Sequence, residues 1–458
     1  MMQTDRRSFA RGIAALAFGG LAASCARPLA TTAADGAPAG YGPLVEDPGG
    51  LLDLPRGFSY RVISSLGDAM SDGNKVPDRA DGMGCFRLDA NRIALVRNHE
   101  LGAHHAATGP FAGGAAASSV ASFDRVSASG QPMPGGTTTI VLDARTLAVE
   151  SQYLSLVGTI RNCAGGITPW GSWLTCEEDV TRAGAGRAPG TRDHGWVFEV
   201  PAAAGRLVDP VPLTAMGRRN HEAACVDPRT GIVYLTEDRN DSLFYRFLPE
   251  APGRLSAGGR LQALAFIDTG RTDTRNWNGA DMAPGEEVGV RWIDLNGVEA
   301  PDDDLRDRGH AAGAALFARG EGIWWGNGEL YFTATSGGRV KESQVFRYIP
   351  SRAEGQAGER DAPGRLKLFL ESPGRDTLSY ADNLTVMPNG HLMLCEDQYE
   401  VGAVNHLRGV TPAGDVYPFA RIRLSTEPAG VCFSPDGRTM FVNLYSPTRT
   451  LAITGPWA

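Results

Sequence analysis

Cysteines, tryptophans and acidic residues are concentrated in one short stretch, residues 162–179, which reads NCAGGITPWGSWLTCEED. Cys163 and Cys176 could form a disulfide, bind a metal ion or simply pack inside a strand, and the acids that end the stretch could bind a cation. Twelve residues separate the two cysteines and the chain has no C-x-x-C pair, so the spacing fits no zinc template. Cys163 stands beside a glycine turn, whereas Cys176 lies in an apolar run that is typical of a buried strand.

The pattern of that stretch, a glycine turn followed by alternating apolar residues and then acids, recurs along the 458-residue chain. Such copies, at intervals of roughly fifty to a hundred residues, each leave room for a four-stranded unit. We therefore expect an all-β fold, a six-bladed β-propeller with long loops over the channel mouth. Two β-sandwiches with coincidental acids at their strand ends are the alternative. The clear copies are 171–179, 231–241 and 390–398, and the looser ones are 91–100, 330–338 and 437–446.

Acids that end equivalent strands of a propeller would converge on its central channel. So many carboxylates cannot all be ionised close together without cations, because like charges raise one another's pKa. Oxygen-rich sites favour calcium, magnesium, manganese or ferric iron, so the pattern predicts a metal centre at the channel mouth. The candidate acids are Glu100, Glu177, Glu178, Glu222, Glu237, Asp238, Glu321, Asp382, Glu396, Asp397 and Glu427.

The N-terminus predicts export. Arg6 and Arg7 precede a mildly apolar stretch, residues 13–23, and this arrangement is typical of a twin-arginine signal. The stretch is too short to cross a bilayer, which takes roughly 20 residues. We assign residues 1–34 to this signal and its linker and residues 35–458 to a single β-propeller catalytic domain.

The expected location is therefore the periplasm or the cell exterior. A soluble mature protein is favoured over a lipid anchor at Cys25, because Ala22 stands where lipoprotein signals usually have leucine. The full chain carries 44 basic and 52 acidic residues, and loss of residues 1–34 removes four arginines and one acid, which leaves 40 − 51 = −11. This acidic charge argues against nucleic acid or an anionic membrane as a partner. We expect the twin-arginine export machinery and a small substrate as partners, and no stable protein partner.

Six stretches of the chain share motifs with a known family: RNHE at 97–100, residues 162–178 of the opening stretch, GRRNHEAA at 217–224, FARGEG at 317–322, ADNLTVMPNGHLMLCED at 381–397 and GVCFSPDGRTMFVN at 430–443. Taken together, these motifs resemble the PhoX-type alkaline phosphatase family. The resemblance implies a six-bladed propeller whose channel mouth holds a mixed cluster of iron and calcium and which hydrolyses phosphomonoesters outside the cytoplasm.

The same resemblance implies roles for individual residues. Cys163 resembles the thiolate that binds iron, and Arg319, two residues before Glu321, resembles the arginine that grips the substrate phosphate. His99 and His221 precede acids and could orient them through hydrogen bonds, or could be buried histidines with other partners. The expected metal ligands are Cys163, Glu178, Glu222, Glu321, Asp382, Glu100 and Glu396, with a structural role as the alternative for the last two.

The sequence also departs from the family. Where family members have a Gln-His-Pro-Gly stretch, this chain reads NLYSPTRT at residues 443–450. Two other functions stay open on the sequence. One is a lactonase-type propeller hydrolase, which would use a single calcium and no thiolate, and the other is an exported propeller that binds metal without catalysis.

Overall fold

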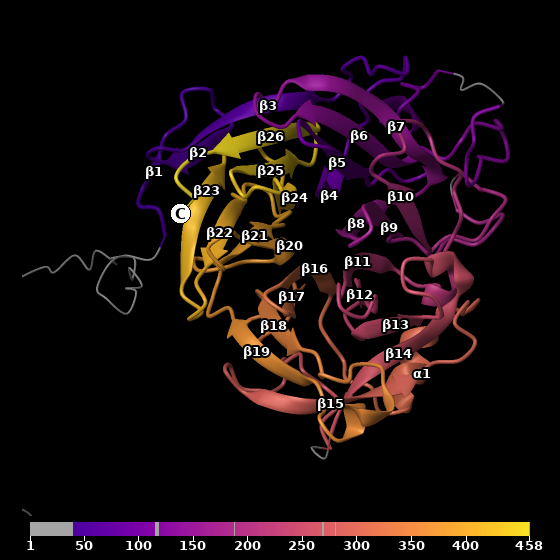
Figure 1. Cartoon of the computed structure of the whole chain (residues 1–458), viewed down its shortest axis with the longest axis vertical. Coiled ribbons are helices and arrows are strands. Elements are labelled where there is room, and N and C mark those ends of the chain that lie inside the picture. Colours follow the sequence, from indigo (N-terminus) through magenta and orange to yellow (C-terminus); the bar gives the residue numbers. More distant parts are fainter. Residues whose placement is uncertain (1–39, 115–118, 187, 268–269, 280, 458) are drawn as a thin grey trace, which may run out of the picture.

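The computed structural model describes residues 40–457, except 115–118, 187, 268–269 and 280 (Figure 1). The predicted export signal and Cys25 lie outside the described residues. Within the described part, strands dominate, and no helix is long and apolar enough to cross a membrane. The helical elements described are α1 (Leu305–Ala311) and short 3-10 turns at Ala106–Thr108, Thr214–Met216, Leu255–Ala257 and Ala357–Arg360.

Six strands surround a central axis, and each is the innermost strand of a blade that runs outward (Figure 1). Each packs against the next around the ring, and the last packs against the first, so the ring closes. The predicted all-β propeller is therefore confirmed. The inner strands are β4 (Ala80–Arg87), β8 (Asn162–Ile167), β11 (His221–Val226), β16 (Gly320–Gly326), β20 (Ala381–Val386) and β24 (Pro428–Phe433).

The outer strands follow in antiparallel order within each blade. Behind β4 lie β5 (Arg92–His99), β6 (Gly135–Asp143) and β7 (Val149–Thr159), and behind β8 lie β9 (Ser172–Glu177) and β10 (Val197–Pro201). Behind β11 lie β12 (Val233–Glu237), β13 (Tyr245–Pro249) and β14 (Gly259–Phe266). Behind β16 lie β17 (Glu329–Ala334), β18 (Gln344–Ile349) and β19 (Arg365–Glu371). Behind β20 lie β21 (Leu392–Glu396), β22 (His406–Val410), β23 (Val416–Ile422), β2 (Leu52–Pro55) and β1 (Leu44–Val45).

The blades are less uniform than the sequence predicts. Strand β15 (Glu287–Asp294) pairs with both β14 and β19, and it joins two blades into one nine-stranded sheet. The described residues therefore form five hydrogen-bonded sheets of three, four, four, six and nine strands. The prediction of six separate four-stranded units was wrong in this detail.

The ring is closed by strands from both ends of the described chain. Behind β24 lie β25 (Thr439–Leu444) and β26 (Arg449–Thr454), and β3 (Ser59–Ser65) from the N-terminal side pairs with β26 as the outermost strand. This pairing fastens the last blade to the first part of the chain, because separating them would break a full strand ladder.

Buried aromatic side chains fill the space between neighbouring blades. Between the blades of β11 and β16, for example, the rings of Phe244 and Phe332 stack with their centres 4.3 Å apart, and Phe317 packs edge-on against Phe332. Each such ring removes a large apolar area from water, and this burial holds the inner strands in a fixed ring.

Candidate metal centre at the channel mouth

The inner strands share one irregularity near their first residues. In β4, Ala80 pairs with His99 and Met83 pairs with Arg97, so Asp81 and Gly82 together face a single residue of β5. This is a β-bulge, which bends a strand and re-aims a side chain. The same shift of pairing occurs at Asn162/Gly165, His221/Ala224, Gly320/Ile323 and Ala381/Leu384.

The bulges carry most of the candidate ligands. The first residue of each bulge is a carboxylate or a thiol in five successive blades, and Ala429 has the corresponding position in β24. Since the inner strands form a closed ring, equivalent positions lie at the same level around the axis. The five residues are Asp81, Cys163, Glu222, Glu321 and Asp382.

A second repeated feature lies just outside the bulges. The residue that follows the second strand of a blade donates its backbone N–H to the residue two positions before the bulge. Examples are Glu178 to Arg161 at 2.8 Å and Thr335 to Arg319 at 2.9 Å. The same bond joins Glu100 to Arg79, Asp397 to Tyr380 and Tyr445 to Glu427. Each of these blades therefore contributes three residues to the mouth.

The arginines at this level adopt an unusual backbone conformation. Arg79, Arg161 and Arg319 have φ of 55°, 49° and 56°, in the left-handed region that costs a non-glycine residue about 1 kcal/mol or more. Tyr380, at the equivalent position of a fourth blade, has φ of 46°. Such strain persists only where the surrounding structure fixes it, and the backbone bonds just described do so.

The potential ligand atoms lie close enough together to share cations. Within each of three groups of residues, one ligand atom from every member lies within 4.8 Å of the others. The groups are Asp81–Glu100–Cys163, Cys163–Glu178–Glu222 and Glu222–Glu321–Asp382. Because Cys163 and Glu222 each belong to two groups, the three form one continuous cluster across the mouth. Six of the seven predicted ligands are thus brought together, and Asp81 joins them.

The carboxylate of Glu222 shows that this arrangement fits bound metal. Both of its oxygens are buried and neither has a hydrogen-bond partner, and one oxygen of Asp81 is in the same condition. An unpaired buried polar group costs about 1–3 kcal/mol, and more when it is charged. Burial, together with the carboxylates of Glu321 and Asp382, raises the pKa of Glu222 well above its ordinary value. Cations among these oxygens would remove both costs.

Two arginines lie among these acids. Arg161 forms ion pairs with Glu100 at 2.7 Å and with Glu178. Arg319 donates from Nε to Asp238 at 2.7 Å and from Nη2 to Glu321 at 2.8 Å. Both side chains stay partly exposed, at 41% for Arg161 and 21% for Arg319, so an incoming anion can reach them.

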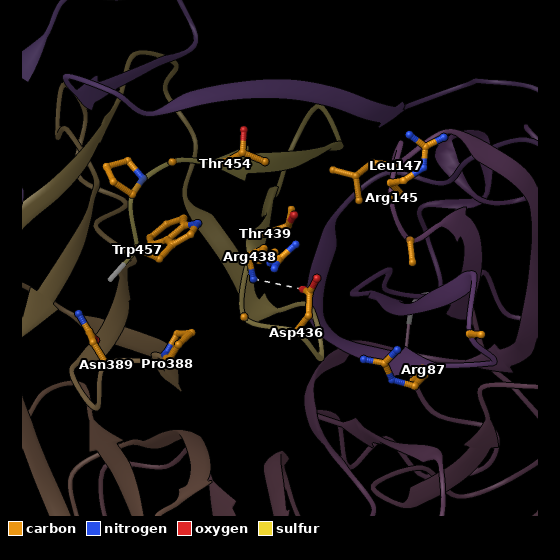
Figure 2. Close-up of a pocket in the computed structure, with 15 residues that line it drawn as sticks. Arg87, Arg145, Leu147, Pro388, Asn389, Asp436, Arg438, Thr439, Thr454 and Trp457 are labelled. Atoms are coloured by element: carbon orange, nitrogen blue, oxygen red, sulfur yellow. Dashed lines mark hydrogen bonds between the residues drawn. The ribbon is translucent and has the colours of Figure 1, made fainter.

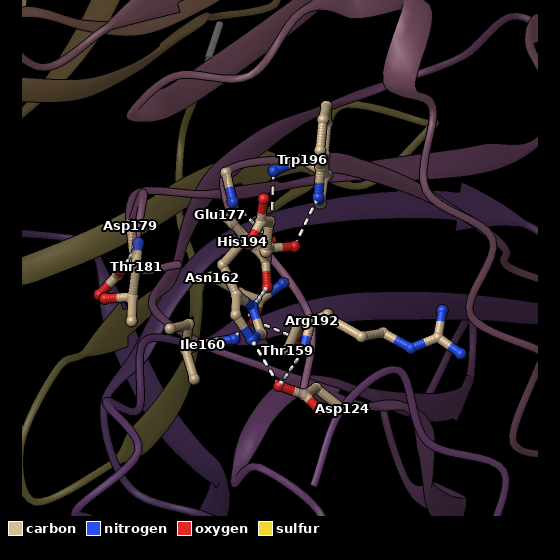
Figure 3. A network of polar contacts seen from close by, with 12 residues as sticks. Asp124, Thr159, Ile160, Asn162, Glu177, Asp179, Thr181, Arg192, His194 and Trp196 are labelled. Carbon is tan, nitrogen blue, oxygen red and sulfur yellow. Dashed lines mark hydrogen bonds and ion pairs between the residues drawn. The ribbon is translucent and has the colours of Figure 1, made fainter. Parts of the chain in front are cut away.

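Glu396 does not join the cluster, contrary to expectation. Its buried carboxylate accepts hydrogen bonds from Arg408 Nε at 2.8 Å, from the backbone N–H of Ser379 at 3.1 Å and from that of His406 at 3.0 Å. Glu177 is occupied in the same manner, by Gly195 N–H and by His194, whose Nδ1 lies 2.6 Å away (Figure 3). The glutamates that end β9 and β21 are thus both held by hydrogen bonds within their own blades.

The histidines of the two NHE motifs do not orient the neighbouring acids. His99 contacts the carbonyl of Asp78 and the hydroxyl of Thr138, and His221 contacts the carbonyl of Gly217 at 2.7 Å. Both are buried histidines with other partners, the alternative that the sequence left open.

The six cysteines of the described chain are all free. Cys176, predicted to be strand core, is fully buried beside Leu174, whereas the Cys163 thiol lies within hydrogen-bond distance of Asp81. The question raised by the opening stretch is thus answered in favour of two unrelated cysteines rather than a disulfide.

A large cavity lies away from this cluster. It measures about 1040 Å³ and is lined by Arg87, Asp436 and Trp457, among others (Figure 2). Arg87 is the last residue of β4, whereas Asp81 lies near the first, so the cavity and the cluster occupy opposite ends of the inner strand. The cavity therefore contributes nothing to the metal centre.

Fold and site together define a β-propeller protein with a carboxylate-rich cluster at the ends of its inner strands that could hold metal ions. Residues 39–448 match the family described as alkaline phosphatase PhoX. The chain therefore belongs to the PhoX family and is an enzyme of the phosphoric monoester hydrolase class.

Comparison with solved structures agrees with the fold. The structure of Pseudomonas fluorescens PhoX in complex with vanadate, a transition-state analogue, aligns with a TM-score of 0.65 and 19% identity, over 88% of this chain and 96% of that chain. A gluconolactonase from Xanthomonas campestris aligns with a TM-score of only 0.38 and 12% identity, over 86% of this chain and 98% of that one. This similarity is too low to support a conclusion about the present chain. No curated protein matches the sequence.

Proposed function

We propose that this chain hydrolyses phosphomonoesters at a cluster of iron and calcium in the channel mouth. The observation that carries the proposal is the position of Glu222, whose two unpaired buried oxygens lie in the middle of a continuous series of ligand groups. Membership of the PhoX family supplies the reaction class.

The donor set supports two kinds of metal. Cys163 is a soft ligand that would hold iron, since a thiolate among carboxylates suits a transition metal better than calcium. Glu178 and Glu222 lie within reach of the same ion, whereas Glu321 and Asp382 offer oxygens only and suit calcium. When bound, these metals would supply the positive charge and Lewis acidity that a phosphate dianion needs at a ring of carboxylates.

The chain's own contribution to substrate binding is Arg319. Asp238 accepts from both Nε and Nη2 of this guanidinium, at 2.7 Å and 3.0 Å, and so fixes the plane of the group. Asp238 and Glu321 occupy Nε and Nη2, which leaves the N–H groups of Nη1 to donate to phosphate oxygens from a guanidinium whose orientation is already fixed. Arg161, between Glu100 and Glu178, offers a second cation at the same level of the mouth.

Two alternatives are weighed against this proposal. A lactonase-type hydrolase with a single calcium needs no thiolate ligand, so it does not explain why the Cys163 thiol lies beside Asp81 and Glu100. A propeller that binds metal without catalysis leaves the two exposed arginines of the mouth unexplained.

Turnover of p-nitrophenyl phosphate by protein exported through its native route, with elemental analysis of the same sample, tests the proposal. We expect iron and calcium in the protein, and activity that a calcium chelator removes. Metal-replete protein without turnover would exclude the phosphatase, and active protein that contains calcium but no iron would contradict the mixed cluster.

We also propose that residues 1–34 direct export through the twin-arginine route and that residues 35–458 form the catalytic propeller. The sequence Arg6-Arg7-Ser8-Phe9 supports the first part. Replacing both arginines by lysine should leave the protein in the cytoplasm, as fractionation would reveal, and normal export of that variant would contradict the assignment.

A further inference from the structure

One loop beside the channel mouth exposes apolar side chains without an evident partner. Among the described residues, nine large hydrophobic side chains are exposed, and three of them lie in this loop between β21 and β22. Tyr399 is 69% exposed, Val401 is fully exposed and Val404 is 37% exposed. Exposed apolar groups that gather beside a site mark a contact surface more often than isolated ones do.

The loop is held in place at two points. At its base, the backbone N–H of Gln398 donates to the Asn405 side chain at 2.7 Å, and Asn405 donates back to the carbonyl of Gln398 at 3.1 Å. Further along, Glu400 accepts two hydrogen bonds from Arg375, at 2.6 Å and 3.0 Å, and Arg375 is also paired with Glu342. Tyr399 lies between these attachments, so the backbone that carries its ring is fixed on both sides.

Tyr399 is backed by a second aromatic ring. The ring centre of Tyr380 lies 5.6 Å away and the two planes are inclined by 31°. Tyr380 has the position in its blade that Arg319 has in the neighbouring one, and its carbonyl accepts from Asp397, the residue that opens the loop. One ring thus supports the other, and the exposed ring stands at the rim of the mouth.

The pair stands on the side of the mouth where Arg319 lies. Tyr380 directly precedes β20, and β20 packs against β16, the strand that Arg319 directly precedes, so the aromatic pair and Arg319 belong to neighbouring blades. Burial opposes the charge of Arg319, but Glu321 and Asp238 raise the pKa of its guanidinium. A phosphate held by Arg319 would leave the rest of the ester close to the exposed ring.

We propose that Tyr399, backed by Tyr380, binds the leaving group of the substrate by stacking, and that preferred substrates are phosphomonoesters of planar aromatic groups such as nucleoside 5′-monophosphates. This inference rests on the proposed function and names its substrate class. An exposed tyrosine ring offers a flat face to any base or aryl group, and stacking on it needs no hydrogen-bond readout. The neighbouring acids Asp397 and Glu400 disfavour a leaving group that carries a second negative charge.

The test compares two substrates across three variants. For wild type, Tyr399→Phe, Tyr399→Ala and the control Val401→Ala, kcat/KM is measured with adenosine 5′-monophosphate and with glycerol 3-phosphate. We expect Tyr399→Ala to lower the ratio of kcat/KM for adenosine 5′-monophosphate to kcat/KM for glycerol 3-phosphate about tenfold, the order expected for one base–aromatic stack. Tyr399→Phe keeps the ring and should retain the ratio, as should Val401→Ala.

Binding of a nonhydrolysable adenosine phosphonate, measured by titration calorimetry, gives a readout that needs no turnover. The dissociation constant should rise about tenfold in Tyr399→Ala and stay unchanged in the other two variants. If Tyr399→Ala changes neither the ratio of the two kcat/KM values nor the dissociation constant, Tyr399 does not bind the leaving group. The proposed phosphatase activity would not be affected by that result. If wild-type protein hydrolyses neither substrate, the proposed function is contradicted. Calorimetry alone would then test whether Tyr399 binds the adenosine group.

Discussion

The Cys163 thiol lies 3.4 Å from a carboxylate oxygen of Asp81, so the first bulge residues of β8 and β4 touch across two neighbouring blades. Burial raises the pKa of both groups. The Asp81 carboxylate raises the pKa of the Cys163 thiol further, and Asp382 and Glu100 raise the pKa of Asp81, although the hydrogen bond from Cys163 lowers it. Ligand atoms of Cys163, Asp81 and Glu100 lie close enough together to bind one cation. Such a cation would stabilise the ionised thiolate and carboxylates better than their mutual contact does.

Replacing Cys163 should therefore remove iron. Since loss of even an outer partner of a ligand costs roughly 10- to 100-fold in metal affinity, loss of the thiolate should cost at least as much. We expect elemental analysis of Cys163→Ala to give iron at background level. The matched control is Cys176→Ala, a buried core position in the same stretch, which should keep its iron and lose only about 1 kcal/mol of stability. Equal iron in wild type and Cys163→Ala would rule out the thiolate as a ligand.

Two glutamates at the ends of equivalent strands should respond differently to the same substitution. Glu396→Gln breaks a buried pair with Arg408, so we expect it to lower the free energy of unfolding by about 3–5 kcal/mol while the metal content stays at the wild-type level. Glu178→Gln should instead lower the metal content, because Glu178 shares a group with Cys163 and Glu222. Denaturation curves and elemental analysis on both variants check this, and metal loss in Glu396→Gln would restore it as a ligand.

The contrast between these glutamates shows what the sequence could predict. Glu178, and not Glu177, is among the ligands expected from the sequence, and the structure places Glu178 in the cluster while the backbone N–H of Gly195 binds Glu177. Glu396 lies outside the cluster because its carboxylate is bound by Arg408 and Ser379, which come from other parts of the blade. Nothing in the residues next to Glu396 reveals those contacts.

Asp81 was missed for a related reason, since its role depends on a bulge that forms only when β4 pairs with β5. A sequence signal exists nonetheless. The tetrapeptides RADG at 79–82, RNCA at 161–164 and RGEG at 319–322 share an arginine, a ligand two residues later and then a small residue. The small residue is required because the next inner strand lies close: a Cβ on Gly82 would come within 2.6 Å of the Ala164 backbone. Aligning copies on the first strand of each blade, rather than the second, would have found Asp81.

Arg319 should matter for transition-state binding more than for folding. In Arg319→Ala we expect kcat/KM for p-nitrophenyl phosphate to fall by roughly 10²–10³, the range seen when one donor to a developing charge is removed. Arg319→Lys keeps the charge but loses the paired donors, so it should recover only part of this loss. Arg339→Ala, an exposed arginine whose nearest carboxylate is 4.0 Å away, serves as the control and should behave as wild type. Equal activity of Arg319→Ala and Arg339→Ala would remove Arg319 from the site.

A buried histidine beneath the cluster predicts a pH dependence of stability. His194 lies 2.6 Å from Glu177 and 3.2 Å from Asp124 (Figure 3). Burial opposes its charge, but these two carboxylates outweigh that effect and raise the pKa of His194 from 6.5 to about 10. Because the folded state holds this proton more tightly than the unfolded state does, the stabilisation is complete below about pH 6.5 and is lost as the pH rises to about 10.

The sign and size of this effect can be isolated by comparing wild type with His194→Gln. A single group changes the free energy of unfolding by at most about 1.4 kcal/mol per pH unit. Between pH 7 and 9.5, wild type should therefore lose stability more steeply than the variant, by a difference that approaches this limit. Urea denaturation of both proteins across the range, in the presence of a chelator so that metal binding does not contribute, measures the two slopes. Parallel slopes would show that His194 is neutral in the folded protein.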